Sequence, residues 1–161
     1  MTDPPSPLEP QRFFAQTWQG EGELAPRGLL AHLPGARRFS FRSFTTMVSE
    51  DFWIVHDETR WEDGRIELRD GLCRRLDETT LRMTYNDMLG GTEVRLRSDG
   101  YDLGPYAMLV SAPGLPLRLP VRCTDSCRLE PDGTLVDSID LTVLGVRVGR
   151  QIIHLRARSE R

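Results

Sequence analysis

The segment 51–61 carries the densest set of side chains that could do chemistry. Residues two apart in a strand point to the same side of a sheet, so His56, Glu58 and Arg60 would share one face. If that face is interior, the arginine can bind a carboxylate in a bidentate manner and the glutamate can accept a proton. If it faces solvent, the three side chains form a surface network that contributes little to stability. The bulk of Trp53 on the opposite face favours the surface interpretation.

A second candidate is the segment 80–87, where Leu81, Met83, Tyr85 and Asp87 share a face. An apolar stripe with a phenol and a carboxylate at its end suits the inner wall of a ligand cavity. Ordinary core packing is the alternative, with the Tyr85 hydroxyl bonded to Asp87 or to the backbone. We expect Trp53 of the previous segment to contribute to the same wall.

Tyrosines and arginines recur on the later strands. Tyr101, Tyr106, Arg118 and Arg122 would suit a ligand with an anionic head and an apolar tail if they lay at the mouth of a barrel. Surface positions explain them equally well.

Motifs for metal binding and nucleophilic catalysis are missing from the sequence. His32, His56 and His154 do not stand at zinc-ligand spacing, and no HExxH occurs, so no metal site is expected. There is no GxSxG motif, and Cys73 is followed directly by two arginines, Arg74 and Arg75. All 21 basic residues are arginine, which excludes lysine Schiff-base chemistry. Catalytic residues therefore stay unassigned.

Composition limits the class of protein. The 161 residues fit one domain, expected over 10–161, after a flexible proline-rich arm at 1–9. A net charge of −3 argues against nucleic-acid binding. No apolar run approaches the ~20 residues of a membrane span, and the N-terminus lacks signal-peptide features, so a cytoplasmic location is expected.

The three cysteines are predicted to be reduced and structural. Their odd number matches no zinc pattern. On an extended segment Cys123 and Cys127 would be ~13 Å apart, too far for a disulfide.

The alternation of apolar and polar residues, interrupted by Asp-Gly pairs, predicts an all-β fold. Asp63-Gly64, Asp99-Gly100 and Asp132-Gly133 each separate two β-rich runs and favour hairpins. Short links and missing helices favour an antiparallel up-and-down barrel of about ten strands. The expected strands are 17–24, 38–48, 52–61, 65–75, 80–87, 92–97, 101–110, 117–129, 134–144 and 146–158.

Three further segments are expected around this barrel. Phe14 and Trp18 stand four residues apart in Pro10–Trp18, which suits a short helix plugging one end. The segments Ala25–Arg37 and Ser111–Pro116 are rich in Gly, Pro and Leu, as in lids over a barrel mouth or in ordinary wide connections.

Several short motifs follow one another along the chain: WQGEG at 18–22, Arg38-Phe39, Asp57-Glu58, WEDGR at 61–65, DMLGGT at 87–92, Asp132-Gly133 and LGVRVGR at 144–150. In this order they resemble a bacterial family of uncharacterised lipocalin-like proteins. The resemblance implies a calycin barrel and no agreed activity, so it bears on fold more than on function.

A fainter resemblance is to the haem-binding nitrobindin barrels. Trp18, Gly20 and Gly22 are similar to their first strand, and His154-Leu155 stands in a context like that of their haem-ligating histidine. This resemblance implies haem as a cofactor, with His154 as the iron ligand.

Three functional hypotheses follow. The first is binding of an apolar or amphipathic small molecule inside the barrel. Its site would use Trp53, Glu58, Met83, Tyr85, Asp87, Tyr101, Tyr106 and Arg122. The second is a haem protein through His154, or an enzyme using Asp87 and Glu58 as an acid/base pair. The third is a barrel filled by its own side chains that serves as an interaction surface, and a homodimer is compatible with all three.

Overall fold

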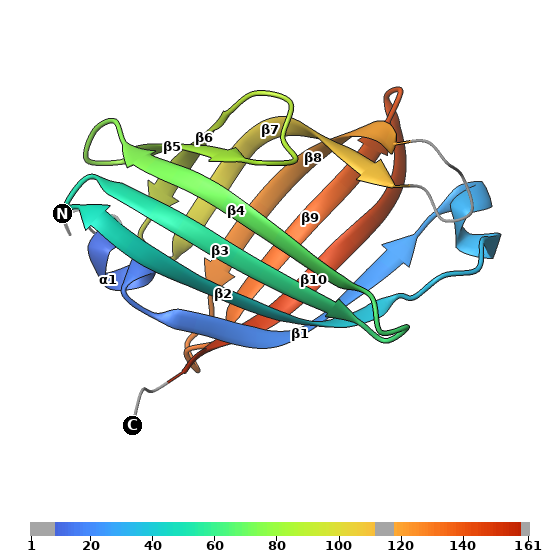
Figure 1. The fold of residues 1–161 in the computed structure, drawn as a ribbon, viewed down its shortest axis with the longest axis horizontal. Coiled ribbons are helices and arrows are strands. Elements are labelled where there is room, and N and C mark those ends of the chain that lie inside the picture. The colour runs from blue at the N-terminus through green and yellow to red at the C-terminus, as the bar shows by residue number, and fades with distance from the viewer. Residues whose placement is uncertain (1–8, 112–117, 159–161) are drawn as a thin grey trace, which may run out of the picture.

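The protein folds into a closed antiparallel barrel. The computed structural model describes residues 9–111 and 118–158. Within them every strand pairs with its neighbours in the chain, and the first strand pairs with the last (Figure 1). The strands are β1 (Thr17–Pro26), β2 (Arg38–Ser49), β3 (Phe52–Trp61), β4 (Ile66–Arg75), β5 (Thr80–Tyr85), β6 (Thr92–Arg97), β7 (Gly100–Ser111), β8 (Arg118–Leu129), β9 (Leu135–Val143) and β10 (Val146–Arg158).

The all-β class and the up-and-down order predicted from the sequence are confirmed. Each expected strand agrees with an observed one to within two residues at both ends. The Asp-Gly turns have the expected geometry, since Gly64 and Gly133 adopt φ of +86° and +82°. At the second of these turns the Asp132 carboxylate accepts a hydrogen bond from the Thr134 N–H at 2.9 Å.

The N-terminal helix α1 (Pro10–Phe14) closes one end of the barrel and is shorter than predicted. Trp18 belongs to β1, so the expected helical pairing with Phe14 is wrong. Instead the Trp18 indole donates a hydrogen bond to the Phe13 carbonyl at 3.2 Å. The Phe14 ring stacks on Trp53, with ring centroids 5.3 Å apart. The helix therefore closes this end of the barrel through one hydrogen bond, from Trp18 of β1, and one ring stack, on Trp53 of β3.

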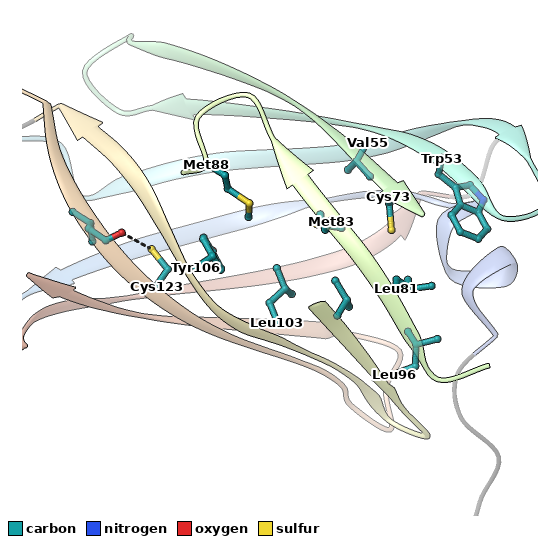
Figure 2. Packing of buried hydrophobic residues seen from close by; sticks show 12 residues of the cluster. Trp53, Val55, Cys73, Leu81, Met83, Met88, Leu96, Leu103, Tyr106 and Cys123 are labelled. Atoms are coloured by element: carbon teal, nitrogen blue, oxygen red, sulfur yellow. Dashed lines mark hydrogen bonds between the residues drawn. The ribbon is translucent and has the colours of Figure 1, made fainter. Parts of the chain in front are cut away.

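Side chains from several strands fill the half of the barrel next to α1. Trp53, Leu81 and Cys73 are almost completely buried there and belong to one packed cluster (Figure 2). The three cysteines are free thiols in this interior, as the sequence predicted. Burial raises the pKa of Cys73 and of Cys123 to about 12, so neither is a reactive thiolate at neutral pH.

The opposite end of the barrel is surrounded by the longer connections. The expected lid at 25–37 contains the 3-10 helix η1 (Gly28–His32), which lies at the far end from α1 (Figure 1). Most of the second expected lid, and the arm except Glu9, lie outside the described residues. Among the described residues, no helix has the length and apolar character needed to cross a membrane.

Candidate ligand site in the barrel interior

The orientation of β3 decides which polar groups lie inside. Trp53, Val55 and Asp57 are buried and point inward, whereas His56 and Arg60 point outward. His56 Nδ1 lies 2.8 Å from a carboxylate oxygen of Asp70 on the outer surface of β4. The surface interpretation of the His56, Glu58 and Arg60 face is therefore confirmed.

An arginine reaches the interior from β4, directly opposite Asp57 in the strand register. Arg69 Nη2 donates to Asp87 Oδ1 at 3.0 Å, and Nε lies 2.8 Å from Oδ2 without good alignment of its N–H. The guanidinium also lies over the Tyr85 ring, 4.3 Å from its centroid. Burial would lower the pKa of Arg69, yet Tyr85 and Asp87 raise it above its ordinary value. Arg69 is a permanent buried cation whose directed contacts go to Asp87.

Tyr85 connects this ion pair to Asp57. Its ring packs on Gly71, where an added Cβ would lie 2.8 Å from a ring carbon, so a glycine is needed for the close approach. The hydroxyl of Tyr85 and that of Ser43 donate to the Asp57 carboxyl group. Asp57 is 7% exposed, and burial raises its pKa despite these bonds and the nearby Arg69. Its Oδ1 has no hydrogen-bond partner among the residues that the structure describes.

A second pair of carboxyl groups faces the same interior from β8 and β9. Asp125, 7% exposed, shares a hydrogen bond with Asp137. Burial raises the pKa of both, and the Asp137 charge raises that of Asp125 further, so each carboxyl group holds a proton more tightly than a free aspartate does. Oδ1 of each aspartate is buried and has no hydrogen-bond partner among the described residues.

Two more tyrosines lie in the barrel interior, near the polar layer formed by Asp57, Asp125, Asp137 and the Arg69–Asp87 ion pair. Tyr106 is buried opposite Cys123, and Tyr101 lies at the plug end with its ring 5.4 Å from that of Phe13. Burial raises the pKa of both phenols well above 10, so each is neutral at physiological pH. They are hydrogen-bonding groups without charge.

Towards the open end the inner wall becomes apolar and less buried. Four side chains on β7 and β9 are half-buried and pack against the edge of the core; these are Met108, Ile139, Leu141 and Val143. Phe41 and Trp61 line the facing strands, also half-buried. Within the described part of the chain, the indole N–H of Trp61 is buried without a hydrogen-bond partner. The inner wall beyond the carboxyl groups is thus lined by apolar side chains that are only partly buried.

The structure brings together most of the residues proposed from the sequence. Trp53 and Met83 lie in the core, Tyr85, Asp87 and Tyr106 lie in or beside the polar layer, and Tyr101 lies near the plug. Three proposed residues face outward and line no interior site: Glu58, Arg122 and His154. The reason is alternation, because the inner face of each strand is occupied by their immediate neighbours.

Glu58 and His154 meet on the outside instead. They line an open hollow of about 1250 Å³ across the outer surface of β3, β2, β1 and β10, together with Arg42, Arg60 and other polar side chains. His154 stands between the inward-pointing Ile153 and Leu155 and is itself exposed. Its side chain points away from the barrel interior, so His154 does not fit as the ligand of an interior haem. Glu58 and Asp87 are separated by the barrel wall and do not form an acid/base pair.

The sequence analysis did not select Arg69, Asp125 or Asp137 as site residues, and it named Asp57 only in the Asp57-Glu58 motif of the family resemblance. A usable signal was present, since each aspartate occupies the apolar phase of a strand. Asp125 stands between Cys123 and Cys127 in an alternating run. A carboxylate in that phase must be buried, which is costly unless it is paired or protonated.

Comparisons with known proteins support the fold alone. No family model and no curated protein matches the chain. Among solved structures, the crystal structure of Rv2717c from M. tuberculosis superposes with a TM-score of 0.58 at 14% sequence identity. The match covers 91% of this chain and 93% of that one. At this identity the chain is similar to that protein in its barrel architecture.

Proposed function

We propose that this protein binds a small amphipathic molecule inside a lipocalin-like barrel. The polar end of the ligand contacts the layer formed by Asp57, Asp125 and Asp137, and its apolar part lies along the mouth. Membership of the lipocalin-like family and a single domain over 10–161 are parts of the same proposal.

The observation that carries the proposal is the set of unpartnered polar atoms in the interior. Asp57, Asp125 and Asp137 each bury one carboxyl oxygen that has no hydrogen-bond partner in residues 9–111 and 118–158. Native proteins satisfy nearly all buried polar atoms, because each unpaired one costs about 1–3 kcal/mol. A bound molecule that forms hydrogen bonds with several of these oxygens gains this energy on binding. This is what we expect of a preformed site for a polar group.

The apolar half of the site follows from the wall around the mouth. Ile139 and Leu141 pair with Asp125 and Cys123 across β8 and β9, so they share the inner face with the carboxyl layer. They are partly exposed, unlike the core beside α1. Covering such side chains contributes about 25 cal/mol for each Å² of apolar surface removed from water. Small-molecule sites typically combine an apolar wall with a few polar groups.

Binding of the neutral dye Nile red tests the proposal. We expect saturable binding with a blue-shifted emission, because the dye enters an apolar interior. Leu141→Arg places a charge on the inner wall at the mouth and should weaken binding at least tenfold.

Leu144→Arg is the matched control, since it makes the same change in the β9–β10 turn at a side chain that is 97% exposed. It should leave dye binding unchanged. Binding that is not saturable, or that Leu141→Arg leaves intact, would contradict an interior site.

A further inference from the structure

The unpartnered atoms in the interior are mainly acceptors. In the described part of the chain they are the Oδ1 atoms of Asp57, Asp125 and Asp137, against one N–H donor, that of Trp61. The Nε of Arg69 also lacks a well-aligned bond, but it already lies beside Asp87. Asp57 and Asp125 are both more than nine-tenths buried. A molecule that satisfies this set must bring hydrogen-bond donors to the carboxyl layer and not further acceptors.

The balance of charges in the carboxyl layer also favours a ligand that brings hydrogen-bond donors. Four carboxyl groups face it from three strands and the loop after β5, those of Asp57, Asp87, Asp125 and Asp137. Among the described residues that surround these groups, Arg69 supplies the positive charge, and its directed contacts go to Asp87. The tyrosines that face the layer are neutral phenols. The layer therefore carries an excess of carboxyl groups over cations.

From this excess of acceptors and carboxyl groups we infer that the ligand is a cationic amphiphile, whose protonated amine binds between Asp57 and the Asp125–Asp137 pair. The inference rests on the proposed interior site and adds the chemical class of its ligand. An ammonium group offers three N–H donors, and its bonds to carboxylates are charge-assisted and stronger than neutral ones. Among the described residues, no group of three His, Cys, Asp or Glu side chains is placed to hold a metal ion.

An anionic head was one of two interpretations of the tyrosines and arginines on the later strands, and surface positions explained them equally well. The surface position holds for Arg122, which faces outward and is exposed. Arg69 is inside, yet its guanidinium is already neutralised by Asp87. A carboxylate or phosphate head would face unpaired carboxyl oxygens and would be repelled.

Three amphiphiles with the same ten-carbon tail test the inference by calorimetric titration at pH 7.5, below their aggregation concentrations. They are decylamine, decanol and decanoate, which carry a positive, a neutral and a negative head. We expect decylamine to bind at least tenfold more tightly than decanoate, with decanol between them.

Two variants locate the selectivity. Asp57→Asn and Asp137→Asn should each reduce decylamine affinity about tenfold, as expected for loss of one charge-assisted contact, and change decanol affinity less than twofold. Asp70→Asn removes the same charge from an outer-face side chain that is 69% exposed. It should leave the affinity order and values unchanged, which separates a local effect from the general attraction of an acidic protein for cations.

The outcomes distinguish a failure of this inference from a failure of the proposed function on which it rests. If none of the three amphiphiles binds, the interior site itself is wrong. If decanol or decanoate binds as tightly as decylamine, the interior site stands and the cationic ligand is wrong. The comparison of ligands on the unmodified protein does not depend on any variant folding.

Discussion

At the scale of single residues, the buried carboxyl groups determine how the protein responds to pH. Burial raises the pKa of Asp57, Asp125 and Asp137 above the ordinary value of 3.8. The folded protein then binds these protons more tightly than the unfolded chain does. The resulting stabilisation is fully present below the unfolded pKa and is lost as the pH rises through the raised folded pKa.

We therefore predict that the free energy of unfolding decreases between pH 5 and pH 8. The decrease amounts to about 1.4 kcal/mol for each tenfold difference in proton affinity between the folded and unfolded states. In Asp125→Asn the pH dependence should be flatter, and stability at pH 8 should equal or exceed that of the unmodified protein. Urea denaturation at the two pH values measures both effects.

Asp140→Asn provides the comparison on the outer surface. Hydrogen bonding to Arg150 lowers the pKa of Asp140, so the stability that its ionised form contributes is lost only when the pH falls below its ordinary range. This variant should be less stable than the unmodified protein at both pH 5 and pH 8. A stability that rises from pH 5 to pH 8 in the unmodified protein would show that the interior carboxyl groups are ionised without cost.

At the scale of elements, the alternation of apolar and polar residues made the strands predictable, whereas the end of the N-terminal helix was harder to predict. In β6 the burial of side chains alternates without a break, which is the pattern that the sequence already shows. In Pro10–Trp18, the spacing of Phe14 and Trp18 also suggested a helix through Trp18. The pairing of Trp18 with Ala157 on β10 prevails, because sheet pairing satisfies backbone groups along the whole of β1.

The plug formed by α1 gives a prediction at this scale. Phe14→Ala removes the ring stacked on Trp53 and should lower the free energy of unfolding by about 2 kcal/mol, less than for a fully buried phenylalanine. Phe44→Ala, on the outer surface against His56, is the matched change and should cost clearly less. Chemical denaturation measures both, and equal losses would mean that α1 does not hold the end of the barrel closed.

At the scale of the whole molecule, the fold was predictable and the site was partly so. Hairpin links leave few topologies for ten consecutive strands, and closure of the barrel follows from pairing the first with the last. Face assignment within one strand was also open to reasoning, as β3 shows. What a single strand does not reveal is which carboxyl groups meet across the barrel, because Asp57 is far in sequence from Asp125 and their approach depends on closure.

The same limit explains the outward position of His154. The run Ile152-Ile153-His154 breaks the alternation, so the face of the histidine was undetermined from sequence. The register with β1 decides it, since Ile153 pairs with Gly22 on the inner side. The pairing of β10 with β1 in the folded barrel thus fixes the face of His154, which the sequence of β10 alone leaves open.

The central claim is that the ligand lies inside the barrel, between the apolar mouth and the carboxyl layer. The most direct test is a two-dimensional NMR titration with decanol, which is neutral and therefore independent of the ligand's charge. The chain has three indole N–H groups, and Trp61 is the half-buried one near the mouth. We predict that its resonance shifts with saturation while those of Trp18 and Trp53, next to the plug, stay in place. An unshifted Trp61, with changes confined to residues of the outer hollow such as His154, would contradict the interior site.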